Sequence, residues 1–173
     1  YGLFIGNIGL DMCQKAGQKC TAVRRIFVPT DRVDEVKADL IAELGRFPLG
    51  EPTEKTTRLG PVAHSAAHAD VVAGIQRLSE TADVVHGGPE SPKEGAYVQA
   101  TLRQARDADA EILHELEVFG PVATIIPYDG SVERAVELVN RGGGGLVVSA
   151  YSNDATWSQS FVLGAAPYHG RIW

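Results

Sequence analysis

Residues 122–151 have the sequence VATIIPYDGSVERAVELVNRGGGGLVVSAY, in which two apolar runs enclose an amphipathic segment. The β-branched run 122–128 predicts a strand, and residues 146–151 predict another. Between them, residues 131–140 predict a helix whose apolar side chains share one face: Val132, Ala135, Val136 and Val139. The run Gly142–Gly145 lacks the spacing of phosphate-binding loops and favours a turn from helix to strand.

The same alternation of strands and helices extends in both directions from this stretch. Helices are predicted at residues 3–15, 31–44, 65–79, 109–116 and 155–163, and strands at 21–28, 84–85, 97–102 and from 171 onward. Helices of this length between strands are typical of an α/β fold, with an open, mostly parallel sheet and helices on both faces. Such folds bind ligands at the carboxyl ends of their strands, where we therefore expect the site.

Length, charge and cysteine content narrow the class of protein. The 173 residues suit one domain, and the net charge of −6 argues against a nucleic-acid partner, which would require clustered Lys and Arg. No apolar run approaches the roughly 20 residues of a transmembrane helix, so no membrane partner is predicted. Cys13 and Cys20 are too few for a disulfide framework, and a reducing cytoplasm is the expected compartment.

Cys20 is the first candidate for chemistry. It lies in the segment Ala16–Ala22, a glycine-containing turn between the first predicted helix and strand. Small neighbours would admit a substrate carbonyl, free backbone N–H groups would stabilise an oxyanion, and a nearby cation such as Lys19 would favour the thiolate. A buried core cysteine is the alternative, and composition alone favours it because free cysteines are among the most buried residues.

Glu117 and Phe119 are the second set of candidates, within the segment Glu115–Val122. A carboxylate at a helix end can accept two hydrogen bonds from ribose hydroxyls, and an aromatic ring two residues later can pack on a flat ring. The alternative is a helix-terminal glutamate followed by a core phenylalanine and a Gly-Pro turn. Taken alone, this segment favours the alternative.

The histidines bear on two other kinds of site. A cysteine acyltransferase or thioesterase would need a histidine beside Cys20, but none lies near it in sequence. No family motif surrounds any of the five: His64, His68, His86, His114 and His169. His64 and His68 have the spacing of a metal-binding pair but lack the glutamate of the zinc-protease motif, so we expect surface histidines and no metal site.

The two candidate segments together resemble a known family. Gly17–Ala22 is similar to the active-site cysteine signature of the aldehyde dehydrogenase superfamily, and Glu117–Val122 is similar to its second signature, at about the right distance. Residues 49–52, 59–62 and 140–154 resemble further segments of that family, so the similarity extends over essentially the whole chain. Residues 16–25 most resemble the aldehyde dehydrogenase part of bifunctional phenylacetate-degradation enzymes, which act on a coenzyme A-linked semialdehyde, typically with NADP.

The resemblance implies a role for each matching residue. Cys20 would be the nucleophile, forming a thiohemiacetal with the aldehyde and then a thioester that water hydrolyses, and its backbone N–H would help to hold the oxyanion. Glu117 would bind the nicotinamide ribose, and Phe119 would pack near the nicotinamide ring. Gln18 would belong to the scaffold, while Lys19 and the threonine after Cys20 would shape the substrate entrance.

The resemblance also implies what this chain lacks. The chain has no initiator Met and stops abruptly, so residues 1–173 are expected to be an aldehyde dehydrogenase catalytic (thiol) domain truncated at both ends. The cofactor-binding domain, with the glutamate base and the oxyanion-hole asparagine of the family, would be absent. The full-length enzyme would bind NADP or NAD, oxidise an aldehyde and form a homo-oligomer. The fragment alone is expected to hold no cofactor and to be inactive.

Two alternatives stand beside this interpretation. The chain would be a cysteine acyltransferase or thioesterase if a histidine approached Cys20 in space. It would otherwise be a non-catalytic binding or assembly domain that keeps the fold. This second alternative predicts that Cys20 is buried and unreactive.

Overall fold

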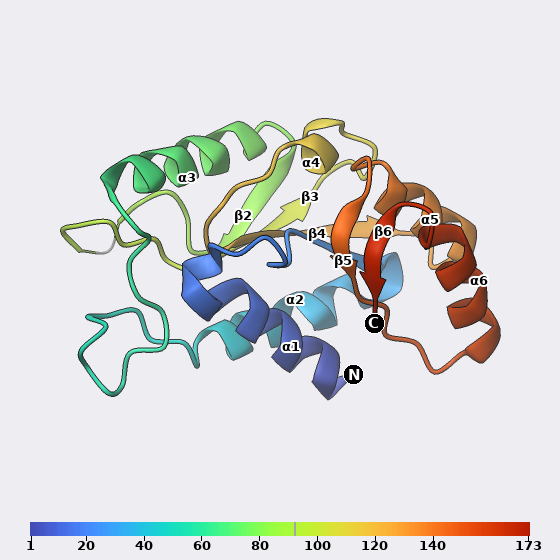
Figure 1. Ribbon diagram of the computed structural model, residues 1–173, viewed down its shortest axis with the longest axis horizontal. Coiled ribbons are helices and arrows are strands. Elements are labelled where there is room, and N and C mark those ends of the chain that lie inside the picture. The colour runs from blue at the N-terminus through green and yellow to red at the C-terminus, as the bar shows by residue number, and fades with distance from the viewer. Residues whose placement is uncertain (92) are drawn as a thin grey trace.

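A four-stranded sheet is the centre of the computed structural model, which describes residues 1–91 and 93–173 (Figure 1). Its strands are β1 (Arg25–Pro29), β2 (Ala82–His86), β3 (Thr101–Ala105) and β4 (Val122–Tyr128). Their spatial order is β1-β4-β3-β2. β4 pairs in parallel with β1 and β3, while β2 pairs antiparallel with β3. Residues 122–126 are all buried, as expected for a central strand covered on both faces.

Helices cover both faces of this sheet (Figure 1). Two lie on each side: α1 (Gly2–Cys13) with α2 (Val33–Leu44), and α3 (Ser65–Leu78) with α4 (Ile112–Glu115). Successive side chains of β3 reach opposite faces, because Arg103 donates to Ile75 O of α3 whereas Gln104 accepts from Lys37 of α2. The predicted α/β class, with an open, mostly parallel sheet and helices on both faces, is confirmed.

The stretch 122–151 contributes to two sheets. After β4 the chain forms α5 (Val132–Asn140), β5 (Gly145–Val148), α6 (Ala155–Ala165) and β6 (His169–Ile172). β5 and β6 pair in parallel as a separate two-stranded sheet, so the predicted strand, helix and strand are present but the two strands do not share a sheet. The glycine run forms the predicted turn, in which Gly144 has φ 109° and lies against the backbone of Tyr168.

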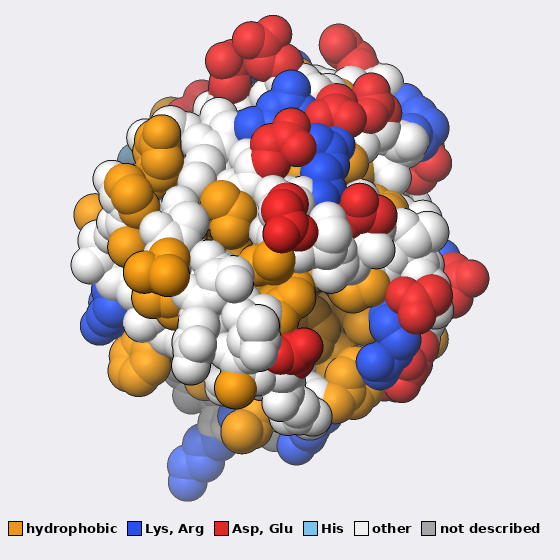
Figure 2. Space-filling model, turned by 90° about the vertical axis from the view of Figure 1, so that its right-hand side faces the viewer, with side chains coloured by type: hydrophobic (Ala, Val, Ile, Leu, Met, Phe, Trp, Pro, Cys, Tyr) orange, Lys and Arg blue, Asp and Glu red, His pale blue; other side chains and the backbone are white. Residues whose placement is uncertain are grey.

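Two hydrophobic cores follow from this arrangement. The larger one fills the space between the main sheet and its helices, and the smaller one lies between α5 and α6: Ala135, Val139, Phe161 and Ala165. Figure 2 faces the side of the molecule that α5 and α6 occupy in Figure 1, and it shows hydrophobic side chains open at the surface there. Within residues 1–91 and 93–173, no helix combines the length and hydropathy needed to cross a membrane.

Two strands begin later than the sequence predicts. β1 begins at Arg25 rather than residue 21, because Val23 N–H donates to the carboxylate of Asp11 and not to a neighbouring strand. β3 covers residues 101–105 rather than 97–102. Tyr97 is buried like a strand residue, but its carbonyl accepts from the Ser91 hydroxyl outside the sheet. In both cases, hydrogen bonds from side chains replace the expected strand pairing.

Candidate active site

Cys20 lies in an exposed turn between a 3-10 turn (Gln14–Gly17) and β1. Cys13, in contrast, is only 1% exposed. Burial, with a smaller contribution from Glu43, raises the pKa of the Cys13 thiol to about 12. The buried-core interpretation therefore holds for Cys13 and not for Cys20, which is the accessible thiol of the two.

The chain approaches Cys20 through a left-handed turn. Lys15, Ala16 and Gly17 have φ values of 55°, 53° and 67°. Left-handed backbone costs a residue with a side chain roughly 1–2 kcal/mol, so packing must hold this turn. Ala16 is 4% exposed, and Gly17 is also buried. Strain of this kind is typical of functional loops, because the surrounding structure has to maintain it.

Asp11 of α1 binds the chain on both sides of Cys20. One carboxylate oxygen contacts the ammonium group of Lys19, which also donates to Gln14 Oε1 at 3.0 Å. The other oxygen accepts from Val23 N–H at 2.7 Å. The charge of Lys19 is thus paired with Asp11, so Lys19 is not a free cation that would favour the thiolate.

Gln18 connects the Cys20 turn to the long loop after α2. Its side-chain oxygen accepts from the backbone N–H of Ala63 at 2.8 Å. Ala63 directly follows the segment 59–62, whose Leu59 and Val62 are buried in the main core. The side-chain oxygen of Gln18 is therefore used to hold the scaffold together.

The second motif is an extended segment after α4 in which side chains alternate between core and surface. Val118 is buried and packs on α3, where a Cβ on Gly74 would lie 2.6 Å from its Cγ2. Glu117 and Phe119 point to the exposed side, and Phe119 is 45% exposed. Gly120 turns inward again, against Val71. The alternative interpretation of Phe119 as a core residue is therefore wrong.

The two motifs meet at the amino ends of the strands. A Cβ built on Gly17 would overlap the carbonyl of Gly120 and lie 2.7 Å from Pro121 N. The Cys20 turn precedes β1 and the Glu117 segment precedes β4, and these strands are parallel neighbours. The expected location at the carboxyl ends is therefore wrong for these motifs. Parallel pairing brings together segments that occupy the same position relative to their strands. Here both motifs directly precede their strands, so they meet at the amino ends.

Arg24 contacts both motifs, although the sequence analysis did not select it. Its guanidinium donates to Gly17 O at 2.8 Å and to Gly120 O at 3.3 Å. The same group lies 5.5 Å from the centre of the Phe119 ring and 3.9 Å from the carboxylate of Glu117. Burial lowers the pKa of Arg24, and the Glu117 carboxylate opposes this shift. The available sequence signal was the basic doublet Arg24-Arg25 at the start of the first strand.

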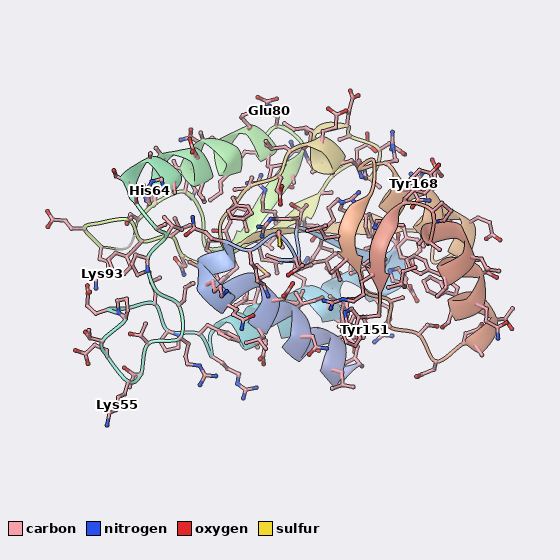
Figure 3. The ribbon with its side chains drawn as sticks, in the orientation of Figure 1. Lys55, His64, Glu80, Lys93, Tyr151 and Tyr168 are labelled. Carbon is pink, nitrogen blue, oxygen red and sulfur yellow. The ribbon has the colours of Figure 1, made fainter. Side chains whose placement is uncertain are left out.

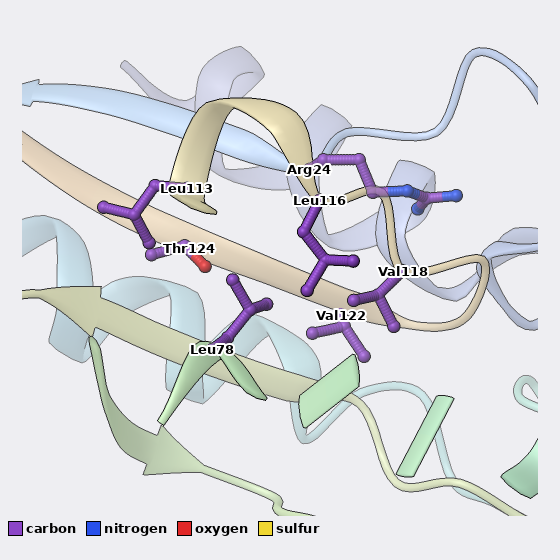
Figure 4. Close-up of a pocket in the computed structure, with 7 residues that line it drawn as sticks. All are labelled: Arg24, Leu78, Leu113, Leu116, Val118, Val122 and Thr124. Carbon is purple, nitrogen blue, oxygen red and sulfur yellow. The ribbon is translucent and has the colours of Figure 1, made fainter. Parts of the chain in front are cut away.

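A small cavity lies beneath the Glu117 segment, as Figure 4 shows. Its volume is about 10 Å³, which is enough for one water molecule at most. The lining is largely apolar and comes from α3, α4 and the adjoining strands: Leu78, Leu113, Leu116, Val118, Val122, Thr124 and Arg24. This cavity is a packing defect under the motif and is too small to bind an aldehyde or a nucleotide.

Two of the histidines have structural partners. His64 begins α3 (Figure 3), and its Nδ1 accepts from Ala67 N–H as the N-cap. His114 is buried, its ring nitrogens bond to Arg25 and to Ala108 O, and burial lowers the pKa of its ring. Neither ring is therefore a free base for Cys20. Among the described residues, no group of three or more His, Cys, Asp or Glu side chains is placed to hold a metal ion.

The chain is similar to known proteins over most of its length. Residues 5–163 match the model of the aldehyde dehydrogenase family. The chain is 37% identical to a 3,4-dehydroadipyl-CoA semialdehyde dehydrogenase of Aromatoleum evansii, over 99% of this chain and 35% of that protein. It is 35% identical to a succinate-semialdehyde dehydrogenase [NADP(+)] of Deinococcus radiodurans, over 83% of this chain and 30% of that protein.

A solved structure extends the similarity to three dimensions. Aldehyde dehydrogenase C from Pseudomonas syringae, in complex with NAD+ and octanal, matches with a TM-score of 0.84 and 28% identity. The match covers 98% of this chain and 36% of that one. The chain thus spans about a third of the length of the relatives it matches. Because the family model matches most of its residues, the chain belongs to the aldehyde dehydrogenase family.

Proposed function

We propose that residues 1–173 form the catalytic (thiol) domain of an NAD(P)-dependent aldehyde dehydrogenase, with Cys20 as the nucleophile. The observation that supports this most strongly is the packing of Gly17, in the Cys20 turn, against Gly120 in the second motif. This packing brings an exposed thiol to the same edge of the sheet as an exposed carboxylate and an exposed aromatic ring.

The proposed chemistry takes place on the Cys20 sulfur. The thiolate adds to the aldehyde carbon, and the carbonyl electron pair moves to oxygen to give a thiohemiacetal. Within residues 1–91 and 93–173, Cys20 N–H donates to no other group, so it is free to stabilise that oxyanion. NAD or NADP, when bound, would supply the two-electron oxidant needed to convert the thiohemiacetal to a thioester. Cys20 then carries a thioester, which water cleaves to release the acid and the thiol.

Glu117 and Phe119 fit the nicotinamide half of NADP or NAD. The Glu117 side chain is 60% exposed and can accept hydrogen bonds from both ribose hydroxyls. The Phe119 ring, two residues later on the same side, offers an apolar surface to a flat ring. The residues present therefore suit the cofactor, and the matched relatives include proteins described with NADP+ and with NAD+.

The rest of the machinery is proposed to lie outside this chain. A cofactor-binding domain of the same protein would supply the glutamate base and the oxyanion-hole asparagine, and the complete protein would be a homo-oligomer in the reducing cytoplasm. The similarity to a CoA-semialdehyde dehydrogenase supports a coenzyme A-linked semialdehyde as the aldehyde substrate. Phenylacetate degradation is the process that we propose for it.

Alkylation by iodoacetamide tests the proposed nucleophile. In the folded chain, Cys20 is expected to react at least about tenfold faster than Cys13, because Cys13 is buried with a raised pKa. The two rates are measured by mass spectrometry of the digested protein, and a sample unfolded in urea provides the intrinsic rate of each thiol. Protection of Cys20 to the same degree as Cys13 would rule out an accessible nucleophile.

Aldehyde oxidation by the chain alone tests the proposed division of labour. The 173-residue chain is expected to give no turnover with NAD or NADP, whereas the complete protein encoded by its gene oxidises an aldehyde with one of them. Formation of the reduced cofactor is followed by absorbance. Sustained turnover by the isolated chain would show that the base and the cofactor site do not lie elsewhere.

A further inference from the structure

Arg24 has a position that the proposed function does not by itself require. Its side chain is only 15% exposed, and a guanidinium that loses its hydration on burial needs hydrogen-bond partners to compensate. Its hydrogen bonds go to two carbonyls that are 103 residues apart in sequence, those of Gly17 and Gly120. Each carbonyl belongs to a different motif. A charged side chain is thus held where Gly17 of the first motif lies against Gly120 of the second.

The next residue, Arg25, serves a different part of the molecule. Its guanidinium donates to Leu138 O and Val139 O at the end of α5 and contacts the ring of His114. Arg25 therefore holds α5 and α4 to the first strand, and among the described residues its guanidinium has no hydrogen bond to either motif. The two arginines are comparable in chemistry and burial, but only Arg24 bridges the motifs.

The contact between Arg24 and Glu117 is too exposed to contribute much to the free energy of folding. The Glu117 side chain is 60% exposed, and ion pairs of this kind contribute little to folding. Arg24 Nε is nevertheless buried, lacks a hydrogen-bond partner among the described residues and lies 3.9 Å from Glu117 Oε1. The Glu117 carboxylate is the acidic group that pairs with this donor, at 3.9 Å. The donor therefore favours one orientation of the carboxylate.

The Phe119 ring is oriented by the same guanidinium. Arg24 Cζ lies 5.5 Å from the ring centre, within the range of a cation–π contact. The ring is 45% exposed, on the same side of the segment as Glu117, so this contact restricts a ring that is otherwise open to solvent. Glu117 and Phe119 are the two residues proposed for the nicotinamide half of the cofactor, and the Arg24 guanidinium lies close to both.

We propose that Arg24 is a positioning residue that joins the Cys20 turn to the cofactor-binding segment and sets the orientation of Glu117 and Phe119. It does not touch the reacting atoms. It fixes where the nicotinamide is held relative to the thiol. This inference rests on the proposed function, because it assigns to Arg24 the geometry between the nucleophile and the cofactor site.

Substitution of Arg24 in the complete protein tests this role. Arg24→Met is expected to raise the KM for the cofactor about tenfold, because a charge-assisted contact is lost, and to change the KM for the aldehyde much less. Arg24→Lys keeps the charge but cannot reach both carbonyls with a planar fork, so an intermediate effect is expected. Arg25→Lys is the matched control and should lower the Tm without changing the KM for the cofactor.

A double-mutant cycle with Glu117→Gln distinguishes a positioning role of Arg24 from a general effect of the substitution on folding. If Arg24 acts through Glu117, the double variant Arg24→Met, Glu117→Gln should bind the cofactor only slightly less tightly than Glu117→Gln alone. Full additivity, or an unchanged KM for the cofactor in both Arg24 variants, would overturn the proposal. Arg24→Lys decides the matter if Arg24→Met fails to fold. Failure of the proposed function would look different, since the unsubstituted protein would then show no NAD(P)-dependent aldehyde oxidation.

Discussion

Replacing Cys20 by serine is expected to lower the kcat of the complete protein for aldehyde oxidation by about a thousandfold or more. The hydroxyl of serine is a far weaker nucleophile than a thiolate, and removal of a covalent nucleophile is among the largest single-residue effects in enzymes. Because Cys20 is exposed, the substitution leaves no cavity and should leave the Tm unchanged. The measurement is steady-state formation of the reduced cofactor, with a thermal melt of the same sample.

Cys13→Ala is the matched control for this experiment. Cys13 is buried in the main core, so its truncation should lower the stability slightly while kcat stays close to that of the unsubstituted protein. A Cys20→Ser protein that keeps more than about a tenth of the activity would be incompatible with covalent catalysis at this sulfur. Equal losses in both variants would point to a general effect on folding.

Gly17→Ala is expected to cause a large loss of stability from a single methyl group. Gly17 has φ 67°, and a Cβ there would overlap the carbonyl of Gly120. The left-handed conformation and the forced movement of packed backbone together should cost roughly 2–5 kcal/mol. For a chain of this size, the Tm would fall by roughly 5–15 °C, as measured by thermal unfolding followed by circular dichroism.

Gly6→Ala is the control for this prediction. Gly6 lies within α1, and a Cβ there meets no atom within 4 Å. Alanine should therefore be neutral or should stabilise the protein by up to about 1 kcal/mol, since glycine is unfavourable within a helix. A Gly17→Ala protein that melts at the same temperature as the unsubstituted one would refute the contact between the two motifs. The control distinguishes this contact from an ordinary replacement of glycine by alanine.

Local sequence patterns were enough to predict most of the fold. The strand at 122–128 has the predicted bounds, and α2 differs from its predicted range only at the start, where residues 30–32 form a 3-10 turn. The predicted end of β3, at residue 102, was too early, because Arg103 continues the strand as a fully buried residue that bonds to backbone carbonyls of α3 and β2. Periodicity assigns a charged residue to the surface and cannot reveal partners that lie far away in sequence.

Part of the candidate site could likewise be predicted from the sequence, and part could not. Cys20, Glu117 and Phe119 could be selected from the sequence because their motifs are contiguous and resemble those of a family. The sequence could not predict that Cys20 and Phe119 are exposed. It also could not predict that Lys19 is paired with Asp11, or that Arg24 joins the two motifs. Each of these facts depends on which segments become neighbours.

The sequence by itself determined the class of fold, the order of most elements and the residues of the two motifs, since these depend on short-range periodicity and contiguous patterns. Only the tertiary structure decided that the motifs meet at the amino edge of the sheet and that Arg24 lies between them. The physical reason is the parallel pairing of β1 with β4, which brings Gly17 against Gly120 across about a hundred residues of chain. No local pattern encodes that contact.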